Sequence, residues 1–263
     1  MIPKIIHYCW YGKGKKDLLT ERCIASWKKY CPDYKIIEWN EDNCDIESSV
    51  WAREAYESEK WAFVSDYFRL KVMYEYGGIY MDTDVEIVKN IDEFLANDAF
   101  VGLADDTYIG SGIFGCGKGN AFCKELLAYY EGRHFINIDG SVNDVPNNQI
   151  YTMICMKKLG FNLEDEQIEC GNTKVYPSDF FSPFKIRTLG DPEIVYNYKN
   201  YDCTSNTHAI HYTVFSWRAE QNSFVSNVKI RINQVVRIIL PRKVYFKIKR
   251  KSKQRMMEKS VFL

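Results

Sequence analysis

Apolar residues recur every three or four positions between residues 61 and 76, which is the spacing of a helix with one face in a core. The pair Gly77-Gly78 follows directly and predicts the end of that helix, because glycine adopts a positive φ without steric cost. Residues 79–81 are continuously apolar and predict a short buried strand. The centre of the chain is therefore expected to be a helix, a glycine stop and a strand.

The pattern on either side of this segment predicts an α/β fold. Short apolar runs predict strands, and longer amphipathic stretches predict helices. A strand, a helix and a second strand open the chain in that order, which favours a parallel pair. The expected strands are residues 4–9, 34–39, 99–103, 108–119 and 207–212, and the expected helices are residues 18–30, 50–58, 121–131 and 147–159.

Some segments depart from a simple alternation of strands and helices. Five glycines lie within residues 108–119, and glycine inside a strand indicates a bulge or a close approach of the backbone to a ligand. Residues 164–201 are expected to form short strands and turns, and their three prolines favour irregular structure that covers the sheet. Asn120 is expected to cap the helix that follows it. The amide-rich helix start at Asn147 predicts capping, with contact to a sugar as the alternative.

Two carboxylates follow the central strand. Asp82 and Asp84 flank Thr83 immediately after the apolar residues 79–81. In open α/β sheets ligands bind beyond the carboxyl ends of the strands, and two carboxylates there suit one divalent cation with phosphate as a further ligand. An acidic turn without a ligand is the alternative that this pattern leaves open.

The helix before this strand carries a charged pair. Asp66 and Arg69 are three residues apart and therefore share one side of that helix. A cation site, a guanidinium group and the end of a buried strand together suit a diphosphate leaving group.

Aromatic and imidazole side chains near predicted strand ends are further candidates. His7 and Trp10 lie at or just past the end of the first strand, where Trp10 could stack on a nucleotide base or form the rim of the core. His211 lies in the last predicted strand, and Trp217 follows shortly after it. A single histidine is more often structural, but His211 and Trp217 together favour a segment that closes over a site.

Composition favours a sizeable globular domain. Of 263 residues, 46% are hydrophobic and 15% aromatic, which is ample for a large core. No apolar run reaches 18 residues, and the N-terminus does not have the form of a signal peptide. Nine cysteines without a CxxC pair favour reduced thiols over disulfides or a zinc site. The cytoplasm is the expected location.

The net charge of zero conceals a basic C-terminus. Residues 226–263 contain 12 Lys and Arg and one acid, a net +11, so the remainder carries 23 basic and 34 acidic residues, a net −11. Apolar residues within 228–240 form one helical face. We expect a domain over residues 1–222 and a basic amphipathic tail over residues 223–263. The tail suits peripheral contact with a membrane surface, with a packing helix as the alternative. No motif supports binding to nucleic acid.

The motifs resemble a known family. IPKIIHYCWYG, SWKKYCPDYKIIEWN, SDYFRLKVMYEYGGIYMDTDVE and the late AIHY and SW are similar to the DXD-containing glycosyltransferases of family 32. The resemblance covers about residues 2–217 and is closest to bacterial capsule and surface-polysaccharide enzymes. It is more distant to yeast α-mannosyltransferases and to the large clostridial glucosylating toxins.

This resemblance implies a GT-A fold, a Rossmann-like mixed sheet flanked by helices. It also implies retaining transfer of a sugar from a UDP- or GDP-sugar donor with Mn²⁺ or Mg²⁺. The acceptor would be a glycan or lipid-linked glycan in capsule, O-antigen or exopolysaccharide assembly, at the inner face of the plasma membrane.

The resemblance also implies roles for individual residues in donor binding. Trp10 would stack on the base, with His7 nearby. Asp66 and Arg69 would hold the donor sugar and diphosphate. The resemblance implies that the nucleotide is contacted by Tyr80 and Asp82.

The remaining implied roles concern the metal and the diphosphate. Asp84 would bind the metal directly, with Asp82, and Trp217 would cover the diphosphate. His211 is the expected late metal ligand, with Ser216 as the competing choice. Ser111 stands where many relatives carry Asn, so the resemblance does not fix the donor sugar.

Other readings of the same residues remain. A phosphatase of the haloacid dehalogenase type also has a DxD after a strand, but it requires Thr or Val where this chain has Glu86. A carbohydrate- or nucleotide-sugar-binding protein without activity would keep the aromatic residues but would not need the four charged ones. A transferase that glycosylates protein is a further alternative.

Overall fold

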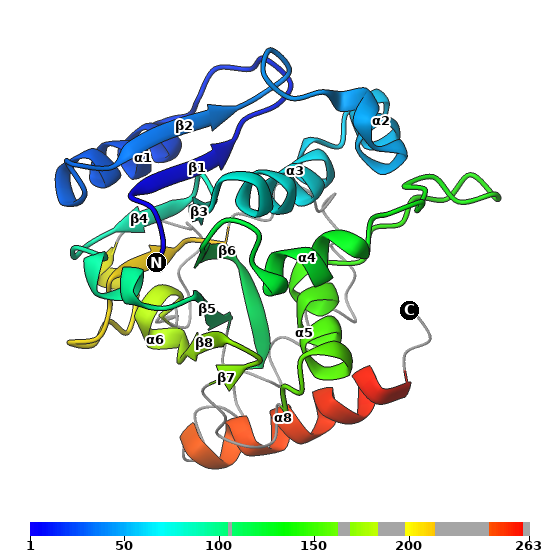
Figure 1. The fold of residues 1–263 in the computed structure, drawn as a ribbon. Coiled ribbons are helices and arrows are strands. Elements are labelled where there is room, and N and C mark those ends of the chain that lie inside the picture. The colour runs from blue at the N-terminus through cyan, green and yellow to red at the C-terminus, as the bar shows by residue number, and fades with distance from the viewer. Residues whose placement is uncertain (105–106, 163–168, 184–197, 214–241, 260–263) are drawn as a thin grey trace.

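A single mixed β-sheet runs through the computed structural model of the chain, which describes residues 1–104, 107–162, 169–183, 198–213 and 242–259 (Figure 1). The seven strands are arranged in the order β2-β1-β3-β6-β5-β8-β7. They are β1 (Ile5–Cys9), β2 (Lys35–Trp39), β3 (Gly78–Met81), β5 (Ala99–Ala104), β6 (Tyr108–Cys116), β7 (Glu169–Cys170) and β8 (Thr173–Tyr176).

The strand directions define one functional edge of this sheet. β1 is parallel to β2 and to β3, whereas β3 and β6 are antiparallel, as are β6 and β5. The carboxyl ends of β1 and β3 therefore lie at the same edge as the start of β6. Because Met81 pairs with Ile113, the residues just after β3 meet the first half of β6 at this edge.

Helices pack on both faces of the sheet because its strands are apolar on both sides. One core lies between the sheet and α2 (Val50–Glu57), α3 (Trp61–Tyr76), α4 (Ala121–Ala128) and α5 (Asn147–Lys158). The other core lies beneath α1 (Leu18–Tyr30) and α6 (Ser178–Phe181). The short 3₁₀ segments are η1 (Ile46–Ser48), η2 (Asp92–Ala96) and η3 (Tyr198–Asn200). The predicted fold class, a mixed sheet flanked by helices, is confirmed.

α3 is the central helix of the domain, and the predicted glycine stop is present at its end. Gly77 has φ +68° and Gly78 has φ +122°, values that L side chains rarely adopt. The predicted single apolar face was too narrow, because Val64, Phe68 and Val72 are buried as well. α3 packs against α2, α4, β1 and β3, so the core surrounds it on most sides.

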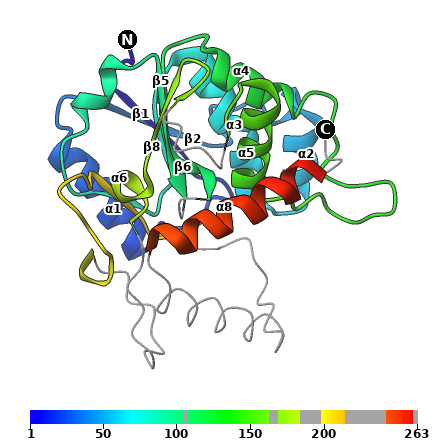
Figure 2. The same ribbon diagram turned by 90° about the horizontal axis from the view of Figure 1, so that it is seen from below.

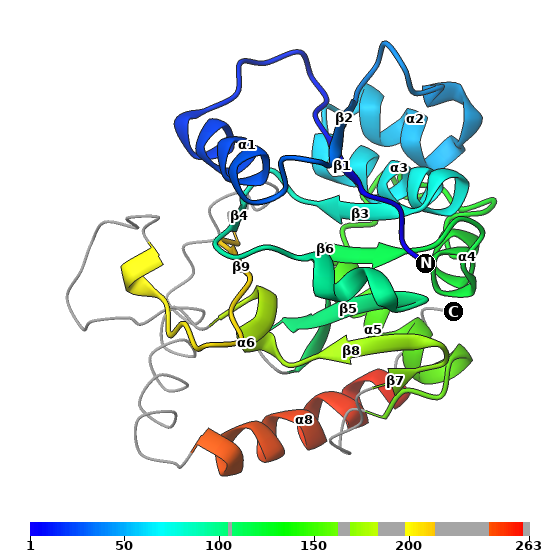
Figure 3. The ribbon, with the colours of Figure 1, turned by 60° about the vertical axis from the view of Figure 1, so that its left-hand side comes forward.

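Two strands were not predicted as they occur. β4 (Val85–Ile87) follows the DTD turn directly and pairs with β9 (Ala209–His211) in a separate two-stranded sheet. β8 lies inside the main sheet parallel to β5, where irregular covering structure was expected from the prolines. A three- or four-residue strand carries too little sequence pattern to be recognised without its partner. Figure 3 shows β4 and β9 together at one end of the sheet.

The C-terminal part of the chain is described only for α8 (Arg242–Lys259). The amphipathic face expected within residues 228–240 lies outside the described residues. α8 runs along one end of the molecule, beyond β7 and β8 (Figures 1 and 3). Among the residues that the structure describes, no helix is both long and apolar enough to cross a membrane. All nine cysteines are free thiols, as predicted.

Candidate metal and donor site

The DTD turn is held by backbone hydrogen bonds on two sides. The N–H of Asp82 donates to the carbonyl of Gly112 on β6 at 2.7 Å, and the N–H of Tyr212 donates to the carbonyl of Asp84 at 3.0 Å. Within the turn, the N–H of Val85 donates to the carbonyl of Asp82 at 3.0 Å. These bonds fix the two aspartates between the main sheet and the small one.

The pairing of β4 with β9 brings His211 to the two aspartates. Val85 is the direct partner of His211 in this ladder. Nε2 of His211 lies 3.3 Å from Oδ1 of Asp84 and 3.8 Å from Oδ2 of Asp82. One ligand atom from each of the three side chains lies within 4.8 Å of the others, and all three are partly buried. Two carboxylates and an imidazole are a donor set that fits a divalent cation.

Arg69 links the helix α3 to this turn. Its Nη1 lies 3.0 Å from Oδ1 of Asp82, and its Nη2 lies 3.1 Å from Oδ1 of Asp66. Nη1 also donates to the carbonyl of Ser111 at 3.1 Å, and Nε donates to the carbonyl of Ser65 at 3.2 Å. Arg69 is only 5% exposed. The guanidinium group therefore anchors Oδ1 of Asp82 and leaves Oδ2 on the side of His211.

Tyr80 and Asp66 support the same arrangement from the protein interior. The hydroxyl of Tyr80 donates to Oδ1 of Asp82 at 3.0 Å, and the Arg69 guanidinium lies over its ring at 4.8 Å. Asp66 is buried and accepts a hydrogen bond from the side-chain amide of Asn147. The expected capping role of Asn147 is wrong, because Pro146 occupies the N-cap of α5 and no side-chain cap bond forms.

Burial and mutual charge shift the pKa values of this group. Burial raises the pKa of Asp66 to about 7, although the neighbouring Arg69 lowers it. Burial also raises the pKa of Asp82 against the opposing charges of Arg69 and His211. Burial lowers the pKa of His211, but Asp84 and Asp82 raise it more, so that its pKa lies above the ordinary value. A bound divalent cation would oppose the shifts of Asp82 and His211, because it favours the ionised carboxylate and the neutral imidazole.

Trp10 lies at the functional edge, as predicted, because it directly follows β1. Its Nε1 donates to the carbonyl of Gly14 at 2.8 Å, and Nζ of Lys16 lies 5.3 Å from its ring centroid. The ring is partly exposed. A partly exposed aromatic ring at this position suits stacking on a base.

His7 is placed differently from the expectation. It is fully buried, accepts a hydrogen bond from Nε1 of Trp39 at 2.9 Å and lies 2.8 Å from the carbonyl of Gly77. Its ring faces the beginning of β3, whereas Asp82 follows the end of that strand. Both ring nitrogens are occupied by structural partners, so we leave His7 out of the proposed donor site. Trp217 and Ser216 lie outside the described residues.

Sequence analysis did not single out Gly112, which lies against two members of the site, Asp82 and His211. Its carbonyl receives the Asp82 N–H, and it follows Ser111, whose carbonyl binds Arg69. A β-carbon at Gly112 would lie 2.5 Å from Nδ1 of His211, closer than side chains tolerate. The glycine-rich segment 108–119 predicted a close approach of the backbone to a ligand. The group that approaches the backbone at Gly112 is instead the imidazole of His211.

Most of the site residues described above lie within a part of the chain that matches a known protein family. Residues 19–101 match the family described as "Glycosyltransferase sugar-binding region containing DXD motif". This range contains α3, β3 and the DTD turn, whereas His211 lies beyond it. The predicted resemblance to DXD-containing glycosyltransferases is confirmed.

Two curated yeast proteins are similar to parts of the chain. Inositol phosphoceramide mannosyltransferase 3 of Schizosaccharomyces pombe is 28% identical over 134 residues, which cover 48% of this chain and 36% of that protein. Mannosyl phosphorylinositol ceramide synthase SUR1 of Saccharomyces cerevisiae is 28% identical over 150 residues, which cover 52% and 37%. The chain therefore spans about a third of the length of the curated relatives it matches.

The chain was also compared with solved structures. The structure titled "PaToxG Glycosyltransferase" has a TM-score of 0.44 and 17% identity, and the match covers 60% of this chain and 70% of that chain.

Proposed function

From the resemblance to DXD-containing glycosyltransferases, we propose that this chain is a metal-dependent glycosyltransferase that uses a nucleotide-sugar donor. The observation that carries the proposal is the convergence of Asp82, Asp84 and His211 on one point at the sheet edge. The buried pair Asp66–Arg69 adjoins this point through Asp82. A ligand-free acidic turn would not need a buried arginine that orients one of its carboxylates.

The metal would be held by Asp84, Asp82 and His211. Carboxylate oxygens suit both Mg²⁺ and Mn²⁺, and the imidazole favours Mn²⁺, because Mg²⁺ prefers oxygen ligands. When bound, the ion supplies a Lewis acid that stabilises negative charge on the departing diphosphate.

The protein residues would orient the reactants and the metal ligands. Arg69 is engaged with Asp66, Asp82 and Ser111, so its first role is to position Asp82. Its positive charge also lowers the potential energy of a diphosphate at the same edge. Trp10 would stack on the nucleotide base, and Trp217 would cover the diphosphate.

Transfer would retain the configuration of the sugar. The bond from the anomeric carbon to the diphosphate oxygen breaks with its electron pair on the diphosphate. The acceptor hydroxyl oxygen forms the new bond to the anomeric carbon from the same face, and its proton passes to the departing diphosphate oxygen. Asp66 is buried and bound to Arg69 and Asn147, which does not suit a nucleophile. The two-carboxylate scheme of retaining glycosidases is therefore not transferred to this site.

The donor is a UDP- or GDP-sugar, and the acceptor is a glycan or lipid-linked glycan. Assembly of bacterial capsule, O-antigen or exopolysaccharide is the proposed setting, on the basis of the sequence motifs. The proposed location is the cytoplasm, with peripheral contact at the inner face of the plasma membrane. Because the names of both yeast relatives include a mannosyl group, mannose donors should be included in any screen.

The test is a thermal-shift and hydrolysis screen of UDP- and GDP-sugars, with Mn²⁺ and with EDTA. A donor that binds the folded state raises the melting temperature by mass action. We expect a shift and slow hydrolysis with at least one donor, and only with the metal. Folded protein that responds to no nucleotide-sugar would contradict the proposal and favour a binding protein without transferase activity.

A further inference from the structure

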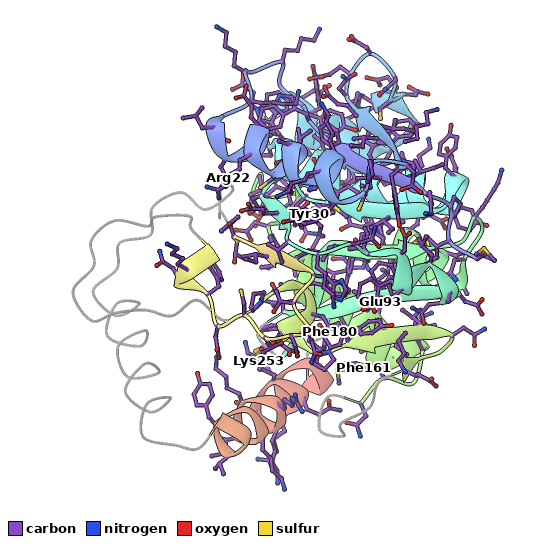
Figure 4. All side chains as sticks on the ribbon, turned by 90° about the vertical axis from the view of Figure 1, so that its left-hand side faces the viewer. Arg22, Tyr30, Glu93, Phe161, Phe180 and Lys253 are labelled. Atoms are coloured by element: carbon purple, nitrogen blue, oxygen red, sulfur yellow. The ribbon has the colours of Figure 1, made fainter. Side chains whose placement is uncertain are left out.

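The inner and outer faces of α8 differ sharply in their contacts. On the inner face Tyr245 is buried, and Nζ of Lys249 lies 5.2 Å from its ring centroid. Lys253 donates a hydrogen bond to the hydroxyl of Tyr108 on β6, and its Nζ lies 4.5 Å from that ring's centroid. Figure 4 shows Lys253 on the side of α8 that faces the domain. The inner face is thus attached to the main sheet.

The outer face is exposed and combines apolar with basic side chains. Val244, Ile248 and Met256 are 44%, 57% and 45% exposed. Successive exposed residues of α8 are alternately three and one positions apart in the sequence, so they all lie on one side of the helix. Among the α8 side chains that the structure describes, the exposed ones are Val244, Lys247, Ile248, Lys251, Ser252, Arg255 and Met256, and none of these is acidic.

Charge separates α8 from the rest of the chain. The sequence of α8 contains nine Lys and Arg and one Glu, a net +8. The whole chain has 35 basic and 35 acidic residues, so the remainder has 26 and 34, a net −8. A negatively charged surface would therefore attract α8 and repel the domain. The charges alone would therefore turn α8 toward such a surface.

We propose that the outer face of α8 is a docking surface for an anionic lipid bilayer. The basic side chains would contact phosphate head groups, and Val244, Ile248 and Met256 would enter the boundary of the acyl chains. A nucleic acid would use the charges but not the exposed apolar side chains, and the described outer face offers no aromatic ring for base stacking. Seen from below, α8 crosses the molecule in front of the sheet and α5 (Figure 2).

Docking through α8 would also fix the direction of the candidate site. Tyr108, which binds Lys253, lies on the same strand as Gly112, which binds Asp82. The two residues are four positions apart along the strand, a distance of about 14 Å. The DTD turn would then be held near the bilayer. The consequence that the acceptor is lipid-linked rests on the proposed transferase function, whereas the docking itself does not.

Vesicle binding of the full chain tests this inference. Co-sedimentation would compare vesicles of phosphatidylcholine alone with vesicles that contain phosphatidylglycerol, at low and high salt. The charge-reversal variant Lys247→Glu/Lys251→Glu should bind the anionic vesicles at least about 30-fold more weakly. The matched control Lys118→Glu/Lys124→Glu changes the same charge at exposed positions elsewhere and should bind like the wild type.

A second variant isolates the apolar contribution. Ile248→Ser keeps every charge, and it should weaken binding several-fold at high salt, where the electrostatic attraction is screened. Circular dichroism and melting temperature establish that each variant is folded. Equal binding of both charge variants, equal binding to neutral vesicles, or absence of wild-type binding would overturn the docking surface.

Donor hydrolysis in solution separates the two proposals. A Lys247→Glu/Lys251→Glu protein that loses vesicle binding but hydrolyses the donor normally supports docking through α8. Wild-type protein that binds anionic vesicles without any metal-dependent response to nucleotide-sugars would leave docking intact and contradict the transferase. Reduced hydrolysis together with unchanged vesicle binding would contradict the docking role of α8.

Discussion

The candidate site has two halves that are built in different ways. Asp66, Arg69 and Asp82 come from one short stretch of the chain and are joined by ion pairs inside the protein. His211 is brought to Asp84 by a three-residue ladder between β4 and β9. In the first half Arg69 pairs with both carboxylates, whereas the second half adds the Asp84 carboxylate and the His211 imidazole, whose ligand atoms converge with one oxygen of Asp82. Stability should therefore depend mainly on the first half, and metal affinity on the second.

Asp84→Asn should produce the largest loss of activity. It removes one anionic ligand of the proposed metal, so donor hydrolysis should fall about 1,000-fold or more. The melting temperature without metal should stay near that of the wild type. Enzyme kinetics measure the loss of hydrolysis, and thermal melts measure the melting temperature. Asp139→Asn, which changes an exposed carboxylate, is the control. Wild-type turnover in the Asp84 variant would refute the metal role.

Arg69→Ala should produce the largest loss of stability. It leaves the buried Asp66 and the partly buried Asp82 without their shared cation, and breaking a buried ion pair typically costs about 3–5 kcal/mol. Chemical denaturation measures the free energy of unfolding. Arg53→Ala, at an exposed pair with Glu47, should cost about 1 kcal/mol or less. Similar values for the two variants would mean that the buried pair does not stabilise the first half.

Acid should destabilise the domain through His7. Burial lowers the pKa of His7 from 6.5 to about 4, although the hydrogen bond with the Gly77 carbonyl raises it. The unfolded chain therefore binds more protons between these values, and stability falls as pH falls from about 6.5 to 4. The loss amounts to about 3 kcal/mol. His7→Asn should flatten this part of the stability–pH curve, and an unchanged slope would contradict the assignment.

Gly112→Ala should weaken metal binding with a smaller effect on stability. The new β-carbon would displace the His211 ring, because it would lie 2.5 Å from Nδ1 of that ring. We expect metal affinity to fall about 10–100-fold, as for residues that orient metal ligands. Gly117→Ala is the matched control, since its β-carbon would meet no atom closer than 3.8 Å. Equal metal affinities for the two variants would show that Gly112 does not position His211.

The first half of the site could be predicted because its pattern is local. The spacing of Asp66 and Arg69, the glycine stop and the position of Asp82 after an apolar strand all follow from helix and strand periods. The helix α1 was predicted with the observed bounds for the same reason. Short-range order of this kind needs no knowledge of distant partners.

The second half depends on contacts between distant segments. β4 is three residues long and was not recognised, so the position of His211 opposite Val85 could not be derived. Asn147 binds Asp66 across 81 residues, and the close fit of Gly112 to His211 appears only in three dimensions. His7 carries no mark in the sequence that separates a buried structural imidazole from one in a site.

A titration with Mn²⁺ tests the central claim most directly. Wild-type protein and His211→Ala would be compared by calorimetry in the absence of nucleotide, with melting temperature as the folding control. We expect one Mn²⁺ site in the wild type and clearly weaker binding in the variant, because one of three convergent ligands is lost. Equal affinity in the two proteins would show that the β4–β9 junction does not build the metal site.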